Sequence, residues 1–356
     1  MAVMFMGSGA SAHSHGEPMN GQQHMAGMHG GGHSVSPAGI PGDNMPAGAF
    51  MLNYRPMFMH MQGSQIGRSD VSPEFIVTNV PNPNAPPPTL RVVPTEMDMQ
   101  MHMFMAMYAP ADWLTLMAMT SYTNKEMKHI TFQGPMGANR LGTFTTEANG
   151  IGDTSLAAIF KAYDDGRNRV QFTAGLSLPT GSITERDDVL APTGATPTLR
   201  LPYAMHLGSG TYDLLPAVTW RRREGPWSFG ARYMGVFRLG DNNQGYAFGD
   251  VHTVTAWGAY QWNPIVNTSL RIAARNEGTI EGRDAMIAAP VQTADPNNYG
   301  GERVDLLLGV NLSGQGALSG MQLAVEAGIP LYQDLNGPQM ETDVVVQFSL
   351  VKMFMP

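Results

Sequence analysis

The chain has 356 residues, and its 21 Lys and Arg against 29 Asp and Glu give a formal net charge of −8. The absence of cysteine excludes disulfide frameworks, thiolate metal sites and cysteine nucleophiles. The acidic balance argues against nucleic-acid binding, which needs a basic surface, and no apolar run is long enough to predict a membrane-spanning helix. Only 14% of the residues are charged, whereas 28 are methionine, and both features need an explanation.

The N-terminus, residues 1–12, reads MAVMFMGSGASA. An apolar stretch that ends in the small residues Ala10-Ser11-Ala12 is typical of a secretory cleavage site. No basic residue precedes it, so we expect a residual, shortened signal peptide over 1–12. The alternative is a hydrophobic N-terminus that stays on the mature chain.

Residues 13–46 are rich in Gly, His and Met and show no hydrophobic periodicity, which predicts a disordered periplasmic tail. Thioethers select Cu(I), and imidazoles suit Cu(II), so the tail is a candidate copper-binding segment. If cleavage follows Ala12, the new terminus His13-Ser14-His15 offers a square-planar nitrogen set for Cu(II). The alternative is a plain linker or a tag, but the histidines are interleaved with Met and Gly. The candidate ligands are His13, His15, His24, Met25, Met28, His29 and His33.

From residue 47 onward, side chains alternate with a period of two, as in β-strands. The clearest segment is 96–108, where six methionines at the odd positions 97–107 share one face. Similar segments bring the expected number of strands to twelve. They are 50–63, 96–108, 113–124, 154–163, 169–178, 212–221, 227–233, 250–262, 266–272, 303–312, 321–329 and 343–350.

The connections between these strands alternate between short and long. The long ones are expected at 64–94, 125–153, 180–210, 239–249, 276–301 and 332–341. An even number of strands with short turns on one side and long loops on the other indicates an all-β fold, an antiparallel transmembrane β-barrel over 47–356. This predicts an outer-membrane protein of a Gram-negative bacterium, in contact with outer-membrane lipid and with both termini periplasmic. A soluble β-sandwich would not explain the one-sided loop lengths.

Two segments also show a family resemblance. Tyr108 to Tyr122 (YAPADWLTLMAMTSY) forms a strand, a tight turn and a strand, and 150–183 contains Gly152-Asp153 before one strand and Leu178-Pro179-Thr180-Gly181 after the next. This pattern resembles the outer-membrane "transporter" proteins grouped with the meta-pathway of phenol degradation. The resemblance implies a barrel that moves small molecules, and it supplies no catalytic residues.

The alternation also assigns faces to the strands. Glu96, Asp98, Gln100 and His102 would be costly against lipid, so we expect that face to line the lumen. The six methionines of 97–107 are then expected to face lipid, or packed protein, as plain hydrophobic side chains. Met57, Met59 and Met61 share a face with Arg55, and Met117 and Met119 share one with Thr115. Together with His102 these five methionines are expected on one lumen wall. They are either successive thioether ligands for Cu(I) along the lumen or flexible side chains that pack the pore.

The charged residues give a second expectation. Arg221 to Arg223 form a basic run near a short turn, where we expect them to be solvated. Mixed charges are expected to project into the lumen and to tune conductance. They are Arg169, Arg232, Arg271, Arg275, Arg303, Asp213, Asp305 and Glu326.

The sequence thus predicts a non-enzymatic channel or binding barrel. Copper transport or resistance is the leading interpretation, with a copper ion or small solute as ligand and periplasmic copper proteins as partners. Uptake of small hydrophobic or aromatic compounds is the alternative. An outer-membrane lipid hydrolase would need a Ser/His/acid set, and none is evident, so no catalytic residue and no cofactor other than copper is expected.

Overall fold

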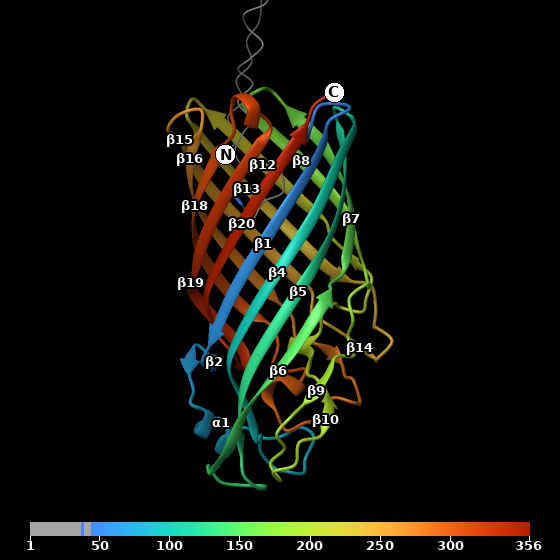
Figure 1. The fold of residues 1–356 in the computed structure, drawn as a ribbon, viewed down its shortest axis with the longest axis vertical. Coiled ribbons are helices and arrows are strands. Elements are labelled where there is room, and N and C mark those ends of the chain that lie inside the picture. The colour runs from blue at the N-terminus through green and yellow to red at the C-terminus, as the bar shows by residue number, and fades with distance from the viewer. Residues whose placement is uncertain (1–36, 39–43) are drawn as a thin grey trace, which may run out of the picture. The chain divides into compact units, whose positions relative to one another are not determined.

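A computed structural model describes residues 37–38 and 44–356. Twelve antiparallel strands close into a barrel, in which each strand pairs with the next and β1 closes the ring against β20 (Figure 1). The strands are β1 (Phe50–Gln62), β4 (Val92–Ala111), β5 (Leu114–Phe132), β7 (Thr154–Asp164), β8 (Asn168–Leu178), β12 (Ala217–Glu224), β13 (Trp227–Arg238), β15 (Val251–Gln261), β16 (Val266–Glu277), β18 (Gly301–Ser313), β19 (Met321–Gln339) and β20 (Thr342–Phe354). The predicted fold class and all twelve strands are confirmed.

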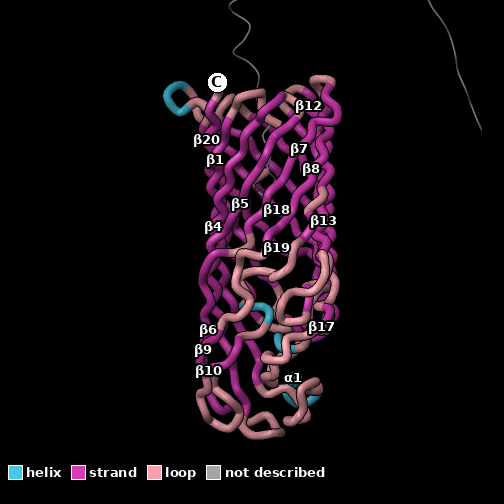
Figure 2. Tube along the Cα trace, turned by 90° about the vertical axis from the view of Figure 1, so that its right-hand side faces the viewer, coloured by secondary structure: helices cyan, strands magenta, loops and turns pink. Residues whose placement is uncertain are grey.

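The two ends of the barrel differ. Short turns close one end, among them 112–113 between β4 and β5 and 225–226 between β12 and β13, and the C-terminus lies there. Long loops project at the other end, where Figure 2 shows them folding together. We call these the short-turn end and the long-loop end. None of the helices in the described ranges has the length and apolarity to cross a membrane.

The long loops carry short elements of their own. These are β2 (Gln65–Gly67), β3 (Ser69–Asp70), α1 (Pro73–Asn79), β6 (Arg140–Ile151), β9 (Arg186–Asp188), β10 (Thr198–Arg200), η1 (Tyr203–Met205), β14 (Tyr246–Ala247), β17 (Glu281–Gly282) and η2 (Gln292–Ala294). The prediction of a loop over 125–153 was therefore wrong, because β5 runs on to Phe132 and pairs with β6. The loop expected at 332–341 was wrong in the same way, because β19 continues to Gln339.

An apolar outer belt lies towards the short-turn end. On β1 the outward side chains Phe50, Leu52 and Phe58 are exposed, and Phe104 and Tyr108 continue the belt on β4. A strand needs about 9–11 residues to cross a bilayer, whereas β4 has 20. The surplus residues of β4 lie beyond the belt, towards the long-loop end.

Loops cover the long-loop end with an apolar cluster of their own. Tyr203, Tyr246 and Ile287 are almost completely buried in it, and Tyr299 packs against it. A loop that carries so many buried aromatic side chains acts as a small hydrophobic core. It fixes the loops over this end of the barrel.

The Gly152-Asp153 and Thr180-Gly181 motifs join the barrel to this cap. Asp153 accepts hydrogen bonds from the backbone N–H of Gly181 (2.9 Å) and from the backbone N–H of Ser209 (2.7 Å). Gly181 lies against Gly208, where a Cβ atom on Gly181 would come within 2.7 Å of the Gly208 Cα. The motifs that carried the family resemblance are therefore structural.

The described chain before β1 turns into the barrel at the short-turn end. Asn44 donates to the Ile159 carbonyl (3.0 Å) and accepts from Gln171 (2.7 Å), and the Met45 backbone N–H donates to the Thr115 hydroxyl (3.3 Å). Both Thr115 and Met45 are buried. The segment 44–49 is thus held inside the mouth of the barrel, although the sequence assigned residues up to 46 to the tail.

Candidate functional site

Methionines line one wall of the lumen. Those of β4 point inward, since Met97, Met105 and Met107 are 6%, 5% and 1% exposed, whereas Phe104 and Tyr108 on the opposite face are 51% and 47% exposed. Of the two environments expected for the six methionines, lipid was wrong, because Met97, Met105 and Met107 pack in buried clusters. So was the prediction that Glu96, Asp98, Gln100 and His102 line the lumen.

The length of β4 explains this error. Of its polar outward residues, Glu96 and Asp98 lie nearest the long-loop end and contact Lys128 and His60 on the outer surface, whereas Gln100 lies opposite the outward Phe58. The ring of His102 instead contacts the outward Tyr54, whose hydroxyl lies 2.8 Å from Nδ1. His102 is therefore not part of the lumen wall.

The five methionines that were predicted to line the lumen do so. The pairing of β1 with β4 is continuous through Pro56, so Met57, Met59 and Met61 keep the inward orientation of Arg55. Met117 and Met119 lie on the buried face of β5 with Thr115. Apart from His102, the structure therefore brings the predicted wall together.

The methionines pair with one another across strands. Met57 lies opposite Met101, Met59 opposite Met99, and Met105 opposite Met119. Directly opposed residues on one face of a sheet have Cβ atoms about 4.5–5.5 Å apart, so these thioethers are neighbours. The result is a methionine ladder along β1, β4 and β5.

The ladder ends in two packed clusters. The loop-end cluster comprises Met61, Met97, Met127, Met205 and Met340. The turn-end cluster comprises Met45, Met51, Met105, Met107, Met117, Met119 and Met353. Sequence reasoning missed Met45, Met205 and Met340, because segments outside the long strands bring them in.

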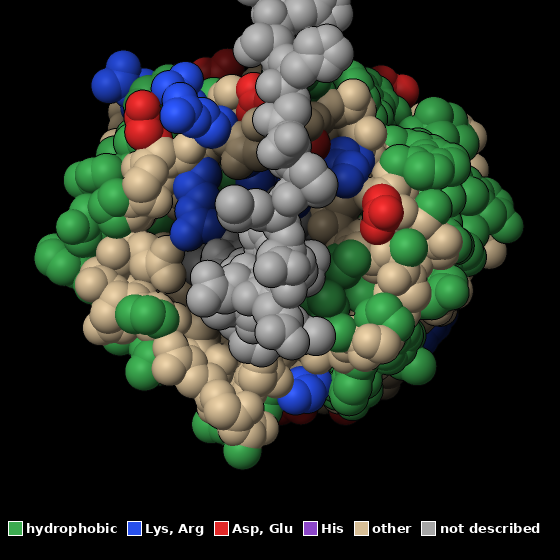
Figure 3. All heavy atoms as spheres, turned by 90° about the horizontal axis from the view of Figure 1, so that it is seen from above, with side chains coloured by type: hydrophobic (Ala, Val, Ile, Leu, Met, Phe, Trp, Pro, Cys, Tyr) green, Lys and Arg blue, Asp and Glu red, His purple; other side chains and the backbone are tan. Residues whose placement is uncertain are grey.

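Arginines also occupy the lumen, and one of them, Arg55, lies within the ladder opposite Met103. Arg55, Arg221 and Arg271 are 8%, 6% and 8% exposed, so the prediction that Arg221 is solvated was wrong. Arg232 lies within electrostatic range of Arg55 and Arg221. Figure 3 shows basic side chains on the inner wall, viewed from the short-turn end.

A single carboxylate in this group is held by a bidentate ion pair. Arg271 donates to Glu326 through Nε (2.9 Å) and Nη2 (2.6 Å), and Gln347 donates to the same carboxylate (2.8 Å). Arg55 interacts electrostatically with both Arg271 and Glu326. Arg55 and Arg271 therefore lie within electrostatic range of the same carboxylate, and Arg232 lies close to Arg55.

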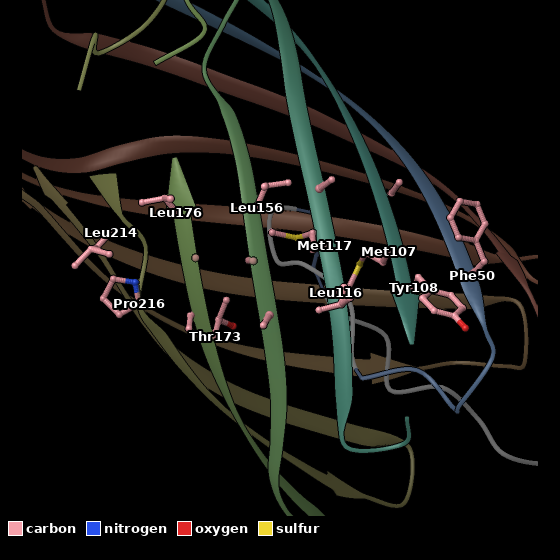
Figure 4. Close-up of a pocket in the computed structure, with 16 residues that line it drawn as sticks. Phe50, Met107, Tyr108, Leu116, Met117, Leu156, Thr173, Leu176, Leu214 and Pro216 are labelled. Atoms are coloured by element: carbon pink, nitrogen blue, oxygen red, sulfur yellow. The ribbon is translucent and has the colours of Figure 1, made fainter. Parts of the chain in front are cut away.

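An apolar groove of about 840 Å³ runs over the barrel wall beside the turn-end cluster (Figure 4). Leu116, Leu156 and Leu176 line it from β5, β7 and β8, and Met107 and Met117 belong both to its lining and to the cluster. Small residues such as Ala157 and Gly175 keep the wall thin here. The groove therefore adjoins the methionine-lined side of the lumen.

Conventional metal ligands gather at one place in the described ranges. His60, Glu96 and Asp98 bring ligand atoms within 4.8 Å of one another on the outer face, and His60 Nδ1 lies 2.8 Å from Asp98 Oδ1. The tail candidates His13, His15, His24, Met25, Met28, His29 and His33 lie outside the described residues.

The cap contains one histidine that sequence reasoning did not single out. His206 is 3% exposed, and its Nδ1 lies 2.7 Å from the Tyr246 hydroxyl while Nε2 lies 3.2 Å from the Leu201 carbonyl. Because a carbonyl can only accept, the proton is on Nε2 and the Tyr246 hydroxyl donates to Nδ1. Burial lowers the pKa of His206 to about 4.

Comparison with known proteins supports the fold. The chain is similar to an outer-membrane channel from Pseudomonas putida F1, with a TM-score of 0.56, 13% identity, and coverage of 88% of this chain and 99% of the other. A FadL homologue from Pseudomonas aeruginosa (TM-score 0.42, 9% identity, 86% and 90% covered) and the P. putida toluene transporter TodX (0.44, 9%, 88% and 91%) are more distant. No family model and no curated protein matches the chain.

Proposed function

We propose that the protein is an outer-membrane channel for small hydrophobic or aromatic solutes. The carrying observation is the methionine ladder, because the inner wall of a water-filled porin is polar, whereas here methionines of β1, β4 and β5 oppose one another along the inner wall. Thioether side chains are flexible and make favourable contacts with aromatic rings.

Uptake by intact cells tests this proposal. A Gram-negative deletion strain would carry the wild-type gene or the variant M57Q/M99Q/M101Q. Glutamine has nearly the same side-chain length as methionine, so the variant makes the middle of the ladder polar without shortening its side chains. We expect toluene uptake at low concentration to fall about fivefold, corresponding to roughly 1 kcal/mol of lost apolar contact. The matched control M136Q/M286Q/M355Q changes three exposed methionines. Equal uptake by both variants would refute the proposal.

Copper handling is the second candidate, and one observation favours it. The Met/His-rich segment 13–46 joins the described segment 44–49, which lies in the mouth of a methionine-lined lumen. Thioether and imidazole are the ligands that Cu(I) and Cu(II) select.

The same strains distinguish the two candidates. Growth in rising copper and the copper content of washed cells are measured for the wild type and for a chain in which the tail histidines are replaced by glutamine. Altered tolerance with unchanged toluene uptake assigns the tail to copper. Unchanged tolerance leaves solute uptake as the only function.

A further inference from the structure

We infer that the turn-end cluster is a binding site for a soft monovalent metal ion, Cu(I) or Ag(I). This inference extends the proposed copper function. It rests on that proposal only for the identity of the physiological ion, copper. Its own basis is the arrangement of seven thioethers around the short-turn mouth.

Four of these methionines form one lateral row. Met353 on β20 lies opposite Met51 on β1, Met51 lies opposite Met107 on β4, and Met107 lies opposite Met117 on β5. Neighbours in such a row have Cβ atoms about 4.5–5.5 Å apart. Flexible thioethers at that spacing can turn towards a shared point, which a row of branched side chains could not do.

A second pair of methionines and the side chain of Met45 complete the cluster. Met105 and Met119 oppose each other one step further into the barrel. Met45 packs over the group from the segment 44–49 and is 2% exposed. It is held there because its backbone N–H donates to the buried Thr115 hydroxyl (3.3 Å).

The placement of methionine argues against simple hydrophobic filling. On β1, β4 and β5 the outward apolar positions are held by Phe50, Leu52, Phe104, Tyr108 and Leu116. Inward positions between them hold Met51, Met105, Met107 and Met117, and the rest of the inward-facing cluster is Ala49, Ala109, Ile159 and Val351. Leucine would fill a buried apolar position equally well and has better-defined rotamers. The placement of methionine on the inward face therefore indicates a role for its sulfur atom.

The surroundings suit a soft ion and exclude a hard one. The polar side chains hydrogen-bonded around Met45, those of Asn44, Thr115 and Gln171, are uncharged. Calcium and magnesium require several oxygen ligands, usually with carboxylates. Thioethers are neutral, soft ligands that select Cu(I), and Ag(I) is a redox-stable probe of the same class.

Silver binding by the full-length protein tests the inference. Purified protein is equilibrated with Ag(I) against a competing thioether ligand, and bound silver is measured per chain. We expect M51L/M107L/M117L to bind one ion fewer than the wild type, or to bind that ion at least about tenfold more weakly. Met and Leu have similar volumes, so each change should cost less than about 1.5 kcal/mol of stability.

The matched control M136L/M286L/M355L removes three exposed methionines and should keep the full number of ions. The intact tail is common to all three proteins, so any silver on it cancels. X-ray absorption at the silver edge should show fewer sulfur neighbours in the cluster variant alone. Equal binding by both variants would overturn the inference. Loss of silver from the cluster variant with unchanged copper tolerance would keep the site and reject the copper function.

Discussion

At the scale of single residues, Glu326 is the most constrained side chain of the lumen. It is fully buried and accepts hydrogen bonds from Arg271 and Gln347. Removing one partner of a buried pair leaves the other charge uncompensated, which costs about 3–5 kcal/mol. Here the remaining Arg271 would also lie near Arg55 without the intervening carboxylate.

We therefore expect E326Q to lower the free energy of unfolding by about 3 kcal/mol, measured by urea unfolding in detergent. The exposed pair of Arg222 and Glu224 provides a control. E224Q should change the stability by less than about 0.5 kcal/mol. If E326Q is as stable as E224Q, the ion pair does not compensate the lumen charge.

The second residue-scale prediction concerns acid. The pKa of His206 is lowered from 6.5 to about 4, so the unfolded cap binds a proton more readily than the folded one. The cap is fully stabilised above pH 6.5, loses stability as the pH falls towards 4, and loses no more below that. A shift of this size corresponds to about 3 kcal/mol.

Hydrogen exchange of residues 201–211 between pH 7 and pH 4.5 measures this effect. We expect faster local opening at low pH in the wild type and little pH dependence in H206Q, whose amide can donate to Leu201 and accept from Tyr246. Lys125, which donates to the carbonyls of Ala204 and His206, stays charged over this range. The same slope in both proteins would show that another group titrates.

At the scale of elements, the connection between β7, β8 and the cap depends on one close backbone approach. Gly181 is held by Asp153 and lies against Gly208. We expect G181A to loosen the loop 179–212, because its Cβ would lie 2.7 Å from a backbone atom, and trypsin should cleave this loop faster. The control G258A places its Cβ 3.6 Å from the Phe229 ring, an ordinary contact, and should not change the cleavage rate.

The strands could be predicted from the sequence because a period of two is a local property. The face of β4 could not, since its polar residues are compatible with a lumen or with water beyond the membrane. Only the position of the apolar belt, which depends on Phe50, Phe58, Phe104 and Tyr108 from two strands, decides between the two. The two methionine clusters could not be predicted for a similar reason. Met45, Met205 and Met340 come from irregular segments, and tertiary contacts set the positions of these segments.

At the scale of the whole molecule, the lumen has two chemically different sides. A methionine ladder runs along β1, β4 and β5, whereas Arg232 and Arg271 project inward from β13 and β16, and Arg55 lies within the ladder opposite Met103. Charged rings in a channel favour ions of the opposite sign. The inward side chains of Arg55 and Arg232 should therefore favour anions over cations.

The reversal potential of the protein in a planar bilayer under a KCl gradient measures this preference. We expect the wild type to select chloride and R55Q/R232Q to shift the reversal potential towards that of potassium. The control R222Q alters an arginine that is 42% exposed near a turn and should leave selectivity unchanged. Cation selectivity in the wild type would contradict the charge assignment.

The anchoring of the segment 44–49 inside the mouth has a kinetic consequence. An ion held anywhere on residues 13–33 is covalently tethered to Met45, so its transfer to the turn-end cluster is an intramolecular step. A short tether produces an effective concentration in the millimolar range, far above that of free copper. If residues 13–33 bind copper as proposed, weak binding and fast release there would suffice to supply the barrel, and the transfer rate would be independent of protein concentration.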